Sequence, residues 1–188
     1  AHPYRSQLAR LMKVPEHKLR VISGDIGGSF GMKASIFSEV PLVLLASKIL
    51  GRPVKWISNR AEAFLSDSHG RDNVVDVELA LDKAGKFLAL RIHSVANLGA
   101  YLMQGSVNPP VNNIGSVAGV YTTPAIYVNV KAVFSNTNPT RPYRGAGRPE
   151  AAFMIERIVD LAADQIGMDP ATLRRINTIA PSAMPYKT

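Results

Sequence analysis

Apolar and polar residues alternate with a period of two in the middle of the chain. The alternation runs through NVVDVELALD at 73–82 and KFLALRIHSVANLG at 86–99, which the glycine turn KAGK joins. Such alternation around a short glycine turn predicts a β-hairpin. Apolar runs at 17–23, 52–58 and 125–136 predict three further strands.

Helical periodicity separates these strands. Residues 35–51 are almost continuously apolar, which predicts a buried helix that ends at a glycine. Residues 151–167 predict a long amphipathic helix, and Asp169 suits the N-cap of a short helix after it. Short helical segments are also expected at 3–13 and 59–67. The irregular order of helices and strands around a central hairpin predicts an α+β fold, in which a mixed sheet packs against helices.

The composition is that of an ordinary globular protein. Hydrophobic residues make up 46% of the 188 residues, and the net charge is +8. The basic residues are spread singly, and aromatics amount to only 7%, so we expect no nucleic-acid partner. Because no apolar run has the length of a bilayer span, we expect no membrane segment. The chain has no cysteine, which excludes disulfides, thiolate zinc sites and iron–sulfur ligation by its own residues.

A glycine-rich loop, GDIGGSFGMK at 24–33, follows the first predicted strand. Glycines between a strand and a helix often form an anion cradle, because free N–H groups converge there. The spacing fits neither the dinucleotide-binding fingerprint nor the P-loop, since Met32 separates Gly31 from Lys33. A tight turn without a ligand is the alternative.

Two further segments lack periodicity, at 101–124 and 138–150. A long irregular segment inside a compact domain is unusual unless it lines a site. The second contains RPYRGAGRP at 141–149, in which three arginines lie among glycines and prolines. Arginine suits phosphates and carboxylates, and a solvated surface turn is the alternative.

Taken together, the two loops resemble those of the molybdenum hydroxylases, the family of xanthine oxidase, aldehyde oxidase and aerobic carbon monoxide dehydrogenase. DIGGSFGMK is similar to the GGGFGGK stretch of that family. PYRGAGRPEAAFMIERIVDLAADQIGMDPATLRRIN is similar to a later block of the same large subunit, in which an arginine–glycine loop opens a long helix. The resemblance covers residues 1–188 and implies one fragment of the molybdopterin-binding domain of a larger catalytic subunit.

The resemblance implies roles for particular residues. The backbone at Phe30 and Arg144 would lie beside the molybdenum, and three residues, Ala34, Leu102 and Ala146, would line the substrate pocket. The cofactor-binding residues implied are Gly27, Gly28, Phe30, Gly31, Arg144 and Gly145.

The sequence also departs from particular members of the family. Purine-oxidising members carry a glutamate where this chain has Ala34 and an arginine near Leu102, so xanthine is not the expected substrate. Carbon monoxide dehydrogenases carry a cysteine where this chain has Gly145, which excludes copper–sulfur chemistry. The second loop, YRGAGRPEA, is most similar to that of carbon monoxide dehydrogenase-like proteins without that cysteine. This resemblance implies hydroxylation of an aldehyde or an N-heterocycle with water as the oxygen source.

Other parts of the site are expected outside the chain. The glutamine that contacts the metal would fall immediately before Ala1, and the glutamate that acts as general base would lie beyond Thr188. No catalytic residue is therefore expected within the chain, which should be inactive alone. The expected partners are the rest of the large subunit, iron–sulfur clusters and FAD on other domains or subunits, and a small-molecule substrate. A cytoplasmic, oligomeric enzyme is expected.

Two other classes of protein fit parts of the sequence. One is a catalytically silent structural or assembly fragment that keeps the fold without the cofactor. The other is a basic nucleic-acid-binding module, but both glycine loops favour a cofactor domain over this class. The residues that would separate a cofactor domain from a silent fragment fall outside the chain.

Overall fold

The predicted hairpin forms in the computed structural model, which describes residues 1–112 and 114–187. Strand β1 (Asn73–Leu81) pairs antiparallel with β2 (Phe87–Asn97). The Asp82 carboxylate closes the turn between them by accepting hydrogen bonds from the Ala84 and Lys86 amides, both at 2.8 Å. Aspartate commonly binds backbone N–H groups in this way in turns.

A third strand makes the sheet mixed. Strand β3 (Ile126–Val133) runs parallel to β2, and the strand order is β1-β2-β3. A parallel neighbour requires a long crossover, and the irregular residues 98–125 provide it. The crossover is more ordered than its composition predicts, because it contains a π-helical turn at Asn108–Asn112 and a 3₁₀ helix at Ile114–Ala118.

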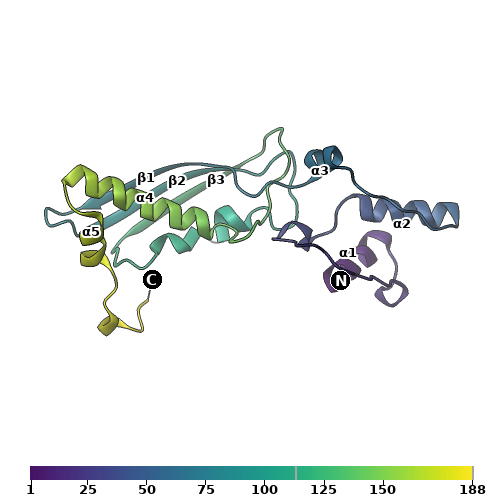
Figure 1. Ribbon diagram of the computed structural model, residues 1–188, viewed down its shortest axis with the longest axis horizontal. Coiled ribbons are helices and arrows are strands. Elements are labelled where there is room, and N and C mark those ends of the chain that lie inside the picture. Colours follow the sequence, from purple (N-terminus) through teal and green to yellow (C-terminus); the bar gives the residue numbers. More distant parts are fainter. Residues whose placement is uncertain (113, 188) are drawn as a thin grey trace. The chain divides into compact units, whose positions relative to one another are not determined.

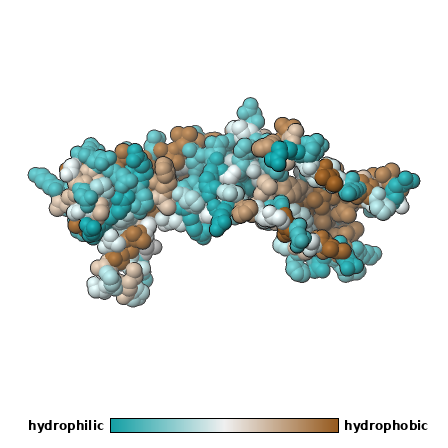
Figure 2. Space-filling model, in the orientation of Figure 1, coloured by the Kyte–Doolittle hydropathy of each residue, from teal (hydrophilic) through white to brown (hydrophobic). Residues whose placement is uncertain are grey.

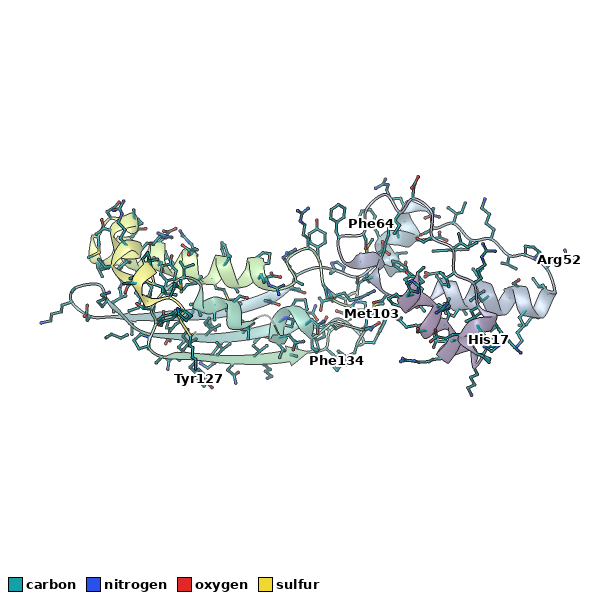
Figure 3. The ribbon with its side chains drawn as sticks, turned by 90° about the horizontal axis from the view of Figure 1, so that it is seen from below. His17, Arg52, Phe64, Met103, Tyr127 and Phe134 are labelled. Carbon is teal, nitrogen blue, oxygen red and sulfur yellow. The ribbon has the colours of Figure 1, made fainter. Side chains whose placement is uncertain are left out.

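Helix α4 (Arg148–Ile166) lies against one face of this sheet (Figure 1). Its apolar stripe meets the inward side chains of the strands, as the amphipathic pattern predicts. On the opposite face, Tyr127 points away from α4 (Figure 3) and its ring lies 5.6 Å from that of His93. The core residues are Phe87, Leu90, Ile92, Val117, Tyr121, Ala151, Met154, Ile155, Val159, Ala162, Ala163 and Leu173. These observations confirm an α+β fold with a mixed sheet packed against a helix.

Helix α5 (Pro170–Asn177) is tied to the hairpin by a buried asparagine. The Asn177 amide nitrogen donates to the Gly85 carbonyl at 2.9 Å, and its oxygen accepts from the Phe87 amide at 2.9 Å. The predicted N-cap is confirmed, since the Asp169 carboxylate accepts from the Thr172 amide at 2.8 Å. This hydrogen bond lowers the pKa of Asp169, because it stabilises the ionised carboxylate.

A buried tyrosine joins the crossover to α4. The Tyr121 hydroxyl donates to Glu156 Oε1 at 2.7 Å, and Arg174 Nε donates to Glu156 Oε2 at 2.8 Å. Burial, together with the hydrogen bond to Glu156 and its negative charge, raises the pKa of Tyr121 to about 12.

We predict that Tyr121→Phe changes how stability depends on alkaline pH. At neutral pH the variant should lose about 1 kcal/mol with the hydrogen bond. Above pH 10 the unfolded tyrosine loses its proton while the folded one keeps it until about pH 12, so the wild type loses stability across this window. Because raising a pKa from 10.0 to about 12 corresponds to roughly 2.7 kcal/mol, the wild type's advantage in unfolding free energy should shrink above pH 10 and reverse in sign before pH 12 in urea titrations. If this difference in unfolding free energy stayed constant with pH, the raised pKa of Tyr121 would be contradicted.

The chain divides into two compact units, Ala1–Ser68 and His69–Thr188, and the sheet belongs to the second. The first contains α1 (His2–Met12), α2 (Glu39–Leu50) and α3 (Arg60–Ser66). Helix α3 begins at a capping box: Asn59 Oδ1 accepts from the Glu62 amide at 2.9 Å, and Glu62 Oε2 accepts from the Asn59 amide at 2.8 Å.

Three predictions for the first unit are wrong. Residues 17–23 and 52–58 form no strand, because the unit has no strand with which they can pair in the described residues. A 3₁₀ helix at Glu16–Lys18 overlaps the first of these stretches. Helix α2 forms as predicted but is not a buried helix, since each of its residues is partly or fully exposed.

The hydrophobic surface of this unit gathers where α1 and α2 lie (Figure 2). The exposed apolar side chains of α2 are Leu42, Leu45, Ile49 and Leu50. In the described part of the chain, no helix combines the length and the apolar character needed to cross a membrane.

Candidate functional site

The first glycine loop has an unusual backbone. Gly27, Gly28 and Gly31 have φ angles of 70°, 104° and 106°. Phe30 has a φ of 51° without being a glycine. A phenylalanine in the left-handed region is strained, and such strain clusters at ligand sites. The φ angles at the other three positions explain why glycine occurs there, because residues with an L side chain rarely adopt them.

Local contacts hold this loop in shape. Lys33 Nζ donates to the Ile26 carbonyl at 2.6 Å, and the Met32 amide donates to the Ser29 carbonyl at 3.0 Å. The Phe30 ring lies over Gly28, so that a Cβ atom at Gly28 would come within 2.7 Å of the ring. Even so, Phe30 remains 54% exposed.

The loop also leaves hydrogen-bond donors without acceptors. Within the described ranges, the amides of Gly27, Gly28 and Gly31 donate to no protein group. A glycine surface with unfilled N–H donors suits an anionic or polar ligand. Ala34, the last residue of the following 3₁₀ turn, is exposed.

The second loop combines three left-handed residues in a row. Gly145, Ala146 and Gly147 have φ angles of 92°, 47° and 97°, and α4 begins directly after them. The loop is tight, because a Cβ atom at Gly145 would lie 2.4 Å from Cγ of Pro149. The Ala146 amide donates to the Tyr143 carbonyl at 2.7 Å, which closes the turn.

The backbone and the side chain of Arg144 have different environments in this loop. Its carbonyl accepts a hydrogen bond from Arg71 Nη2 at 2.6 Å. Its side chain is exposed and makes no hydrogen bond or ion pair in the part of the chain that the structure describes. An arginine side chain that has no partner among the described residues, in the loop that precedes a 19-residue helix, favours a negatively charged ligand.

Leu102 lies in the crossover segment, which packs on the second loop. A Cβ atom at Gly105 would meet the ring of Pro142 at 3.3 Å, so the backbone there runs close to the loop. Leu102 is exposed, and Figure 3 labels Met103, the residue that follows it in the sequence. Leu102 thus lies three residues before the point where this segment approaches the second loop, while Ala34 belongs to the other unit.

Arg71 is the residue of this region that the sequence did not reveal. It precedes β1 by two positions, and its contacts with Arg144 and Glu150 become visible only in the folded chain. By contrast, no cluster of three or more His, Asp or Glu side chains suited to a metal ion occurs among the described residues. The first loop offers backbone amides and the second offers backbone amides and an arginine, and each set by itself suits an anionic ligand such as a phosphate.

Comparison with known proteins identifies a cofactor. Residues 1–178 match the molybdopterin cofactor-binding domain family. The chain belongs to this family. The resemblance predicted from the two loops is therefore confirmed, and so is molybdopterin as the cofactor of the domain.

The relatives are oxidoreductases of several kinds. The chain is 38% identical to the 6-hydroxypseudooxynicotine dehydrogenase complex subunit gamma of Paenarthrobacter nicotinovorans, over 98% of this chain and 23% of that protein. It is also 38% identical to the carbon monoxide dehydrogenase large chain of Hydrogenophaga pseudoflava, over 100% of this chain and 24% of that one. The chain thus spans about a quarter of the length of these relatives.

A solved structure of the family has the same fold. Quinoline 2-oxidoreductase from Pseudomonas putida 86 matches with a TM-score of 0.92 and 36% identity. The match covers 98% of this chain and 24% of that protein. Both glycine loops therefore belong to a fold that is also found in a solved oxidoreductase.

Proposed function

We propose that the two glycine loops form part of the molybdopterin site of a molybdenum hydroxylase. In this proposal Gly27, Gly28 and Gly31 present their amides to the cofactor from the first loop. Arg144 and Gly145 lie against it from the second. The observation that carries the proposal is the run of left-handed residues in each loop, which leaves amide donors directed at no protein acceptor among the described residues.

The chain's contribution to the mechanism is binding and orientation. When bound, the molybdenum cofactor supplies the redox chemistry by which water becomes the oxygen source of a hydroxylation. Phe30 and Arg144 would set the position of the metal through their backbone, and the exposed Arg144 side chain would offset negative charge. A glutamate outside the chain would serve as the general base. Iron–sulfur clusters and FAD, on other domains or subunits, would carry the electrons away.

The proposed substrate is an aldehyde or an N-heterocycle. Three apolar residues, Ala34, Leu102 and Ala146, would line its pocket without a charged handle for the oxygens of a purine. Supporting relatives include the quinoline 2-oxidoreductase above and a nicotine 6-hydroxylase large subunit, to which the chain is 32% identical. An apolar pocket gains little from polar groups on a substrate, whereas a hydrogen-bonding pocket rejects analogues that lack them.

We predict that the complete protein prefers apolar aldehydes or heterocycles to xanthine by about a hundredfold or more in kcat/KM. Steady-state kinetics on quinoline, benzaldehyde and xanthine would measure this preference. A double variant, Ala34→Glu with Leu102→Arg, should narrow it, because it introduces the two polar residues that purine-oxidising members carry. Equal kcat/KM on xanthine and on quinoline in the wild type would refute the proposed substrate class.

The alternative is a silent structural fragment without a cofactor. Molybdenum and pterin contents of the complete protein separate the two hypotheses. Near-stoichiometric amounts of both would support the proposal, and their absence after expression in a host that makes the cofactor would support the silent fragment.

We also predict that the 188-residue chain alone folds at least in its second unit but retains no molybdopterin. Partial sites hold ligands poorly, since the remaining contacts are lost. The exposed apolar side chains of α2 should also make the isolated chain self-associate. Molybdenum analysis and light scattering on the purified chain provide the test. A stable monomer with one molybdenum per chain would contradict this prediction.

A further inference from the structure

We propose that Arg71 is a positioning residue that fixes the backbone of the Arg144–Gly145 loop against the cofactor. This inference rests on the proposed function, since it assigns the loop to the molybdopterin site. It adds a residue that lies outside both glycine loops and that would touch neither cofactor nor substrate.

The Arg71 side chain contacts three parts of the second loop. Its Nη2 donates to the Arg144 carbonyl at 2.6 Å, although the two residues are 73 positions apart. Its Nε pairs with Glu150 Oε1 at 3.0 Å, in the first turn of α4. Its guanidinium carbon lies 5.1 Å from the centre of the Tyr143 ring, within the range of a cation–π interaction. One side chain therefore holds the residues on both sides of the turn.

The position of these contacts gives them a specific consequence. The turn between them consists of Gly145, Ala146 and Gly147, all in the left-handed region. Ala146 is strained there, and strained backbone persists only when its surroundings fix it. Arg71 fixes the carbonyl just before the turn and the carboxylate just after it. Without it, we expect the turn to relax and its amides to change direction.

The chemistry favours arginine over lysine at this position. A planar guanidinium offers donors in a fixed fork, so that it can bind a carbonyl and a carboxylate while it stacks on a ring. A lysine keeps the charge but has a single rotatable ammonium group. The pair is also partly shielded from solvent, since the side chains of Arg71 and Glu150 are 33% and 17% exposed.

The same unit contains two suitable controls. Arg91 and Glu78 form an ion pair on the outer face of the sheet, with side chains 58% and 60% exposed, so it should contribute little. Arg174 bridges Glu156 and Asp160, farther along α4. Arg174→Lys therefore reports on a lost arginine fork that does not touch the loop.

The experiment compares Arg71→Lys, Glu150→Gln, Arg91→Gln and Arg174→Lys in the complete protein. Hydrogen exchange in cofactor-free samples would follow the Ala146 and Arg148 amides, which donate to Tyr143 and Gly145 within the turn. We expect their exchange to quicken about tenfold or more in Arg71→Lys, less in Glu150→Gln, and not in the two controls. In the loaded protein we expect Arg71→Lys to change the Mo(V) electron paramagnetic resonance signal, while the controls keep the wild-type signal.

Unchanged exchange in Arg71→Lys would overturn the proposal. So would faster exchange combined with full molybdenum content and a wild-type Mo(V) signal, because Arg71 would then support the loop without positioning the cofactor. A wild type that binds no molybdopterin would refute the proposed function and with it the positioning role. The exchange data would still show whether Arg71 holds the loop, so the two failures are distinguishable.

Discussion

Replacing Gly28 with valine is expected to lower the molybdenum content of the complete protein about tenfold or more. Gly28 has a φ of 104°, where a β-branched residue is strained by about 1–3 kcal/mol. A Cβ atom there would also come within 2.7 Å of the Phe30 ring. Either the backbone moves or Phe30 leaves its position, and both change the surface offered to the cofactor. Because about 1.4 kcal/mol corresponds to a factor of ten, the strain alone suffices for the expected loss.

The matched control for this substitution lies in the same loop. Gly24 is exposed, its φ is not in the left-handed region, and a Cβ atom added to it would meet no other atom within 4 Å. Gly24→Val should therefore keep the metal. Mass-spectrometric metal analysis and pterin fluorescence would be measured on both variants. Full molybdenum occupancy in Gly28→Val would show that the first loop is not part of the cofactor site.

Gly145→Ala, in the second loop, should lower the molybdenum content of the complete protein by a similar factor. Its Cβ atom would lie 2.4 and 2.5 Å from the Pro149 ring, and the φ of 92° adds strain. Pro149 belongs to the first turn of α4 and cannot swing aside like a flexible side chain. The loop must therefore shift, and we expect molybdenum content to fall about tenfold.

Gly167, in the same unit, provides a control that distinguishes the effect of the close contact at Gly145 from the effect of backbone strain alone. Gly167, which ends α4, has a φ of 67° and open space around the position of a Cβ atom. Gly167→Ala should cost about 1 kcal/mol of stability and leave the molybdenum content unchanged. If both variants lost the metal equally, the effect would be one of general stability, and the assignment of the second loop would fail.

The second unit was largely predictable from the sequence. Its hairpin alternates over most of its length, and α4 has a clear apolar stripe, so that local pattern and tertiary packing agree. The first unit was less predictable. Residues 17–23 and 52–58 have the composition of strands, yet strands need partners, and no strand of that unit is present in the described residues.

The loops of the candidate site were found because glycine and arginine mark them in the sequence. Their backbone angles explain the glycines, and the left-handed Phe30 and Ala146 are additional strained positions that composition does not indicate. Arg71 escaped prediction for a different reason. Its partners lie far along the chain, and an isolated arginine before a strand has no sequence pattern that distinguishes it from a solvated one.

The most direct test of the central claim is the position of the molybdenum atom. Crystals of the complete protein, measured at the molybdenum absorption edge, would give an anomalous difference map that locates the metal. We predict one strong peak beside the backbone of Phe30 and Gly31 and beside that of Arg144, with pterin density against the amides of Gly27 and Gly28. A peak distant from either loop, with the loops contacting only protein, would contradict the account.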